Sequence, residues 1–320
     1  MQRAQIKHSL RGNFRHFNVN MPIRNVLSIS LTASLRRVRC VGRKGTTAIV
    51  SIMLCAFALN AHASDGASLS TLLGLMRTDL AASPFRRPML LKSSDTSGGL
   101  RGDVYAIVDQ PISTLTTLLG TPTQWCETLL LHINNRKCTV AGGAPGEDIT
   151  LSVVRKYDQP VENAFRLPFA FNLIDKTAQH LEVRLTATAG PLGTSNYRIL
   201  VEAVPADAAH SFLHFSYSYE ENFMARTALQ AYLATFGRSK VGFTIIGQTP
   251  EGAPEYVGGT HGLVERNAMR YFLAVDAHVA AKDPDGARNA WFSGSENYPR
   301  QLHEIDRATY LGLKTTDSRP

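Results

Sequence analysis

The first 63 residues contain no aspartate and no glutamate, although they carry ten lysines and arginines. The high isoelectric point therefore belongs to this stretch, because residues 64–320 hold 24 basic and 26 acidic side chains. That later part contains no run of five like charges and no aromatic-basic RNA-binding motif. The shortage of clustered positive charge argues against nucleic acid as a partner.

The acid-free stretch has the three parts of a secretory leader. Arg43 and Lys44 precede an apolar run, Thr46–Leu59, which is followed by the small-residue sequence Ala61-His62-Ala63. This order predicts a signal peptide with an N-terminal extension over residues 1–63, cleaved after Ala63. An uncleaved membrane anchor is the alternative, but the run is shorter than the roughly 20 residues that cross a bilayer. We expect a periplasmic or secreted protein with no transmembrane segment after cleavage.

Cysteines are few. Cys40 and Cys55 lie in the leader, which leaves Cys126 and Cys138 in the exported part. Two cysteines in an oxidising compartment predict one disulfide, and two separate buried thiols are the alternative. The remaining residues, about 257, can form a large core, so folding requires no metal.

The motifs of common catalytic, metal and phosphate sites are missing. The sequence has no HExxH, no GxSxG, no Cys/His set with metal spacing and no glycine-rich phosphate loop. We therefore predict no catalytic residue, no metal and no cofactor. Two strand-borne pairs, Glu202 with Arg198 and Glu182 with Arg184, could bind a polar group if they faced a cavity. We interpret them as part of a solvated outer face. On each strand, the alternate residues that point to the opposite face form the more consistently apolar set.

A helix and several strands follow the leader. Residues 64–101 are interpreted as an N-terminal helix, Ser68–Leu80, and a polar linker, Lys92–Arg101. Gly102–Asp109 alternates apolar and polar residues, which predicts a strand, and Ile112–Leu131 reads as one or two helices. Consecutive strands with short turns then predict an antiparallel meander. Its six expected strands are Asn134–Val140, Asp148–Tyr157, Pro168–Asp175, His180–Ala189, Asn196–Pro205 and His210–Glu220.

Helices end the chain. Phe223–Phe236 comes first, and Leu263–Ala281 is the strongest amphipathic pattern, with Arg266 and Arg270 expected on its polar side. Residues 282–320 are expected to form a helical tail that includes a helix around Pro299–Leu313. The apolar face of the long helix comprises Val264, Ala268, Tyr271, Val275 and Val279.

This order of elements resembles the START-like (SRPBCC, helix-grip) superfamily of lipid-binding domains. The resemblance is carried by Gly102–Val140, which opens with GDVYAIVDQPISTLTTLLGTPTQWCETLLL, and by Val264–Ala281. It implies an α+β helix-grip fold over residues 102–281, in which a curved antiparallel sheet wraps around the long C-terminal helix, with extra helices. It also implies a cavity between sheet and helix.

We therefore expect an exported START-like domain that binds an apolar or amphipathic, lipid-like small molecule in that cavity. An enzyme using the same cavity is one alternative, and would need inward-facing groups such as Arg184 or Glu202. A non-catalytic envelope-interaction protein is the other, favoured if the C-terminal tail fills the opening. Aromatic residues at inward positions are the candidate pocket lining, namely Phe169, Phe171, Phe215, Tyr217, Tyr219 and Tyr271.

Overall fold

The computed structural model describes residues 64–141, 148–235 and 237–317, all within the unit Phe57–Pro320. The expected signal peptide, residues 1–63, lies outside the described residues. In the described part, one sheet has eight antiparallel strands. They are β1 (Met89–Asp95), β2 (Gly99–Val108), β3 (Asn135–Val140), β4 (Asp148–Val153), β5 (Phe165–Lys176), β6 (Leu181–Ala189), β7 (Thr194–Pro205) and β8 (Ser211–Glu221).

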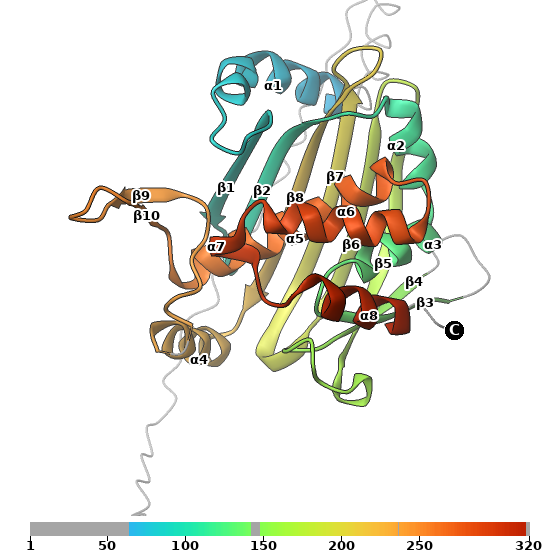
Figure 1. The fold of residues 1–320 in the computed structure, drawn as a ribbon. Coiled ribbons are helices and arrows are strands. Elements are labelled where there is room, and N and C mark those ends of the chain that lie inside the picture. The colour runs from blue at the N-terminus through green and yellow to red at the C-terminus, as the bar shows by residue number, and fades with distance from the viewer. Residues whose placement is uncertain (1–63, 142–147, 236, 318–320) are drawn as a thin grey trace, which may run out of the picture. The chain divides into compact units, whose positions relative to one another are not determined.

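The strands lie in the order β1-β2-β8-β7-β6-β5-β4-β3. The chain leaves β2, crosses to the far edge through two short helices, and returns strand by strand until β8 pairs with β2. The six expected meander strands are thus β3 to β8, and Figure 1 shows them side by side. A separate hairpin comprises β9 (Ile245–Gln248) and β10 (Pro254–Tyr256).

Helices cover both faces of this sheet. They are α1 (Ser64–Ala81), α2 (Ile112–Leu118), α3 (Pro122–Leu130), α4 (Phe223–Ala234), α5 (Gly259–Ala280), α6 (Pro284–Glu296), α7 (Pro299–Leu302) and α8 (Arg307–Asp317), with single 3-10 turns η1 (Val161–Asn163) and η2 (Pro191–Gly193). None of the described helices combines the length and apolarity that crossing a bilayer requires.

The long helix α5 lies across the inner face of the sheet (Figure 1). A Cβ atom on Gly102 of β2 would lie only 2.9 Å from the Cβ of Ala268, so glycine at this position lets helix and strand approach closely. This packing gives the predicted α+β helix-grip fold. The whole expected apolar face of α5 is buried, namely Val264, Ala268, Tyr271, Val275 and Val279.

The outer face of the sheet is covered in part by α1. Leu69, Leu73 and Met76 of this helix form a second apolar cluster, which includes Phe212 of β8 and Val204 of β7. Leu213 and Ala203, their chain neighbours, belong instead to the main core on the inner face. Strand alternation thus separates two layers, with α1 on one side of the sheet and α5 on the other.

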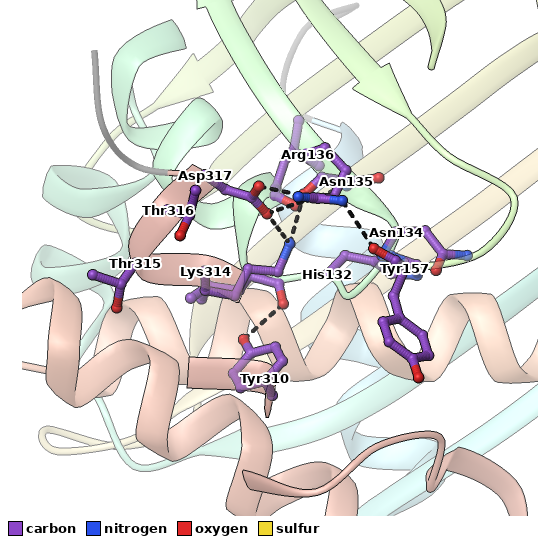
Figure 2. Close-up of polar contacts among 12 residues, drawn as sticks. His132, Asn134, Asn135, Arg136, Tyr157, Tyr310, Lys314, Thr315, Thr316 and Asp317 are labelled. Carbon is purple, nitrogen blue, oxygen red and sulfur yellow. Dashed lines mark hydrogen bonds and ion pairs between the residues drawn. The ribbon is translucent and has the colours of Figure 1, made fainter. Parts of the chain in front are cut away.

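The C-terminal tail packs on the far side of α5 and against β3. Trp291 of α6 donates a hydrogen bond to the carbonyl of Arg270 and stacks on Tyr310 of α8 at 4.8 Å between ring centres. Figure 2 shows Lys314 of α8 donating to the carbonyl of Asn135, and both Lys314 and Arg136 paired with Asp317. The tail is therefore part of the folded core.

Two expectations were wrong. Lys92–Arg101 is not a linker, because Ser94 pairs with Arg101 across β1 and β2, and the polar sequence forms an edge hairpin. Arg266 and Arg270 are not on a solvent-exposed side of α5, since each is only 3% exposed. The tail covers that side, and Arg266 donates to the carbonyl of Gln301 while both guanidinium groups bind Glu304.

Candidate functional site

A cavity of about 160 Å³ lies between the inner face of the sheet and α5. For comparison, an engineered cavity of roughly 150 Å³ lined by apolar side chains binds benzene. Most of its wall is apolar or aromatic, and none of the lining residues comes from the described part of the tail. The strands, η2 and α5 supply this part of the wall, namely Val153, Leu167, Phe169, Pro191, Tyr197, Tyr217 and Tyr271.

Three of the six candidate pocket residues line the cavity, namely Phe169, Tyr217 and Tyr271. Phe215 and Tyr219 are buried on the same face of β8 as Tyr217, but they pack away from the cavity. The remaining candidate, Phe171, is only half-buried at the margin of the core. Strand parity thus gives the correct face, whereas the position along the strand decides which residue reaches the cavity.

His132, Asn134 and Asn267 form the polar part of the wall. Nδ1 of His132 accepts a hydrogen bond from the backbone N–H of Asn134 at 3.2 Å, and the ring stacks on Tyr271 at 4.5 Å between centres. Burial lowers the pKa of His132 well below 6.5, and the nearby cations Arg270 and Lys314 lower it further. The ring is therefore neutral and carries its proton on Nε2, which has no partner among the described residues.

Tyrosine hydroxyls add polarity without charge. Burial raises the pKa of Tyr271 to about 12, and burial also raises the pKa of Tyr217. Tyr197 donates its hydroxyl proton to Thr194 at 2.8 Å. At neutral pH these groups are hydrogen-bonding partners and not bases, so the lining suits an uncharged, largely apolar molecule with a polar substituent.

The carboxylates considered for an enzyme do not face this cavity. On β7, Val201 and Ala203 belong to the inner core, so Glu202 between them lies on the outer face, and Glu182 and Arg184 on β6 alternate with Val183 in the same way. These side chains lie on the outer face, as predicted. The prediction that they are solvated is wrong for Glu182, because only 2% of it is exposed. Glu202 belongs to a buried polar network described below, and Glu182 is paired with Arg184 at 2.6 Å.

Cys126 of α3 and Cys138 of β3 are joined by a disulfide, with 5.4 Å between their Cα atoms. The bond ties the end of the crossing segment to the edge strand beside the cavity. His132 and Asn134, which line the cavity, belong to the segment between the two cysteines.

Among the lining residues that sequence reasoning missed, four carry polar groups, namely Tyr197, His132, Asn134 and Asn267. Tyr197 had a usable signal, because it shares strand parity with the buried residues Ile199 and Val201. The other three had none, since they lie in a connecting segment or on the flank of a helix, where no periodicity points to a cavity.

The antiparallel sheet and the long helix packed across it define an α+β helix-grip fold. No family model and no curated protein matches the sequence. Among solved structures, the chain is similar to norcoclaurine synthase from Thalictrum flavum, with 17% identity over 45% of this chain and 77% of that one and a TM-score of 0.31. It is also similar to Ara h 8.0201, with 12% identity, 60% and 98% coverage and a TM-score of 0.34. A START superfamily protein from Mycobacterium smegmatis shows 12% identity, 42% and 78% coverage and a TM-score of 0.28.

Proposed function

We propose that the protein is an exported domain that binds an apolar or amphipathic, lipid-like small molecule in the inner cavity. The observation that carries this proposal is the cavity of about 160 Å³ between the sheet and α5, with an uncharged wall of mostly apolar and aromatic side chains. Removing apolar surface from water favours binding there, and the few polar groups orient the ligand. The volume suits one ring or a short acyl segment as the buried part of the ligand.

The test is to extract the purified mature protein with organic solvent and identify released compounds by mass spectrometry. Leu167, which lines the cavity, offers the blocking variant Leu167→Trp, because an added indole ring would occupy the space. Leu173→Trp on the same strand is the matched control, since Leu173 is exposed. We expect a compound that accompanies the natural protein and the control but not L167W. Recovery of the same compound in equal amount from L167W would contradict the proposal.

We also propose that the protein acts outside the cytoplasm, in the periplasm or as a secreted protein. The acid-free leader and the pairing of Cys126 with Cys138 support this location. Cell fractionation followed by intact-mass measurement should give an exported chain that begins at Ser64. A chain that keeps residues 1–63 and stays in the cytoplasm would contradict this part of the proposal.

A further inference from the structure

A second and larger hollow, of about 340 Å³, lies on the outer face of the sheet beneath α1. Its roof includes three leucines of α1, and its floor is a row of side chains across β2, β8 and β7. The residues that matter are Leu69, Leu72 and Leu75 in the roof and Tyr105, His214 and Glu202 in the floor. The sheet separates this hollow from the inner cavity, because these floor residues have the opposite strand parity to the inner core.

The floor is held by its own hydrogen bonds. Tyr105, His214 and Glu202 are direct partners in the register of neighbouring strands. His214 bonds Glu202 through Nδ1 and Asp103 through Nε2, both at 2.8 Å, and its ring stacks on Tyr105 at 4.5 Å and 7°. Burial lowers the pKa of His214, but hydrogen bonds to the two carboxylates outweigh this and raise it. With a carboxylate on each ring nitrogen, His214 is an imidazolium whose two N–H groups are both used.

Glu202 is consequently the group that remains for a ligand. It uses Oε2 for His214, whereas Oε1 has no partner among the described residues, and its side chain is 17% exposed. Its neighbour across the strands is Glu182, whose charge is already paired with Arg184 at 2.6 Å, so Glu202 is the acceptor that faces the hollow. A metal ion would need lone pairs that His214 does not have, and no His, Cys, Asp or Glu cluster among the described residues is arranged to hold one.

The roof above this acceptor is mainly apolar, with three leucines beside the hydroxyl residues Ser68 and Thr71. Leu69 is buried, Leu72 is half-buried, and Leu75 is 76% exposed, so the roof leads from the interior to solvent. A carboxylate oxygen next to such a roof loses hydration when the hollow fills, and only a strong donor compensates for that loss. An ammonium group supplies both the hydrogen bond and the opposite charge, whereas an anion would be repelled.

We propose that this outer hollow is a binding site for an amphipathic amine, whose ammonium group binds Glu202 and whose apolar chain lies along the leucines of α1. The site is independent of the function proposed for the inner cavity. His214 positions Glu202 and does not itself contact the ligand through a free nitrogen.

Calorimetric titration of the mature, disulfide-bonded protein tests the site with three probes of equal chain length: hexylamine, hexanol and hexanoate. We expect hexylamine to bind at least about tenfold more tightly than hexanol, which is the range for a hydrogen bond to a charged group, and hexanoate not to bind. Glu202→Gln should remove that preference, and Asp207→Asn, at an exposed carboxylate, should leave it unchanged. Equal binding of amine and alcohol, or an unchanged preference in E202Q, would overturn the proposal.

Two tryptophan variants separate this site from the inner cavity and serve even if E202Q does not fold. Leu72→Trp should fill the outer hollow and abolish hexylamine binding, whereas L167W should leave hexylamine binding intact. Loss of binding in L167W with retention in L72W would place the amine in the inner cavity and refute the outer site.

Discussion

Replacing Glu304 with glutamine tests how the C-terminal tail is held on α5. Oε1 of Glu304 accepts hydrogen bonds from Arg266 at 2.9 Å and from Arg270 at 2.6 Å. The two arginine side chains are 4% exposed, and Glu304 is 22% exposed. Burial lowers the pKa of Arg266 to about 10, and the charge of Arg270 contributes to the decrease. One carboxylate therefore compensates two buried cations.

Removing one partner of a buried ion pair costs about 3–5 kcal/mol. Because Glu304 is partly solvated and glutamine keeps one accepting oxygen, we expect Glu304→Gln to lower the free energy of unfolding by about 2–3 kcal/mol. Arg266→Asp should be at least as damaging, in contrast to the small effect expected for an exposed arginine.

Urea denaturation of the disulfide-bonded protein, produced as residues 64–320, measures both variants. Glu296→Gln is the matched control, because Glu296 pairs with His303 at the surface and such pairs contribute less than about 1 kcal/mol. If E304Q were no less stable than E296Q, the account of a buried, charge-compensated tail would be refuted.

Four further outcomes are expected. Val275→Asp places a charge in the sheet–helix core and should prevent a cooperative thermal melt, while a normal melt would show that α5 presents another face. The protein should show no reactive thiol when unfolded without reductant, and replacing Cys126 and Cys138 by serine should cost about 3 kcal/mol in urea denaturation; two reactive thiols per chain would mean that the bond is absent. Because the pKa of His214 is raised in the folded protein, its contribution to the free energy of unfolding is complete below about pH 6.5 and is lost as the pH rises. His214→Gln should therefore flatten the fall of stability above that pH. The lowered pKa of His132 has the opposite sign, so His132→Gln should flatten the loss of stability as the pH falls below 6.5; unchanged slopes in urea titrations would contradict either assignment.

The central strands and the gripping helix were predictable because burial repeats along them. Val104, Ala106 and Val108 alternate on β2, and Val264 and Val275 recur at helical spacing on α5. Several residues in such a pattern indicate the same buried face, so one exception does not change the predicted face. This redundancy is why the α+β helix-grip fold could be inferred from sequence.

The edge hairpin was not predictable because its polar segment, Lys92–Arg101, lacks a repeated pattern of buried residues. β1 has one neighbouring strand, and its second half, Ser93–Asp95, is polar. Ser93 hydrogen-bonds to the buried Glu265 of α5, so a polar residue occupies a core-facing position. Alternation then fails, and the sequence has the composition of a linker.

The cavity itself depends on what lies opposite each strand. Phe215 and Tyr217 are two residues apart on the same face of β8, yet only Tyr217 lines the cavity. Near Gly102 and Ala268 the helix lies close to the sheet, whereas Tyr271 and Tyr217 border the open space. Such a difference arises from three-dimensional spacing, which strand periodicity does not encode.

The most direct test of the central claim is a nuclear magnetic resonance titration with indole, a probe of one fused ring system, of the ligand-stripped protein produced as residues 64–320. If the inner cavity is the binding site, indole should shift the resonances of Phe169, Tyr217 and Tyr271, and L167W should abolish these shifts while L173W retains them. Saturating indole that leaves these three residues unchanged, or shifts that persist in L167W, would contradict the claim that the sheet and α5 form a functional binding cavity between them.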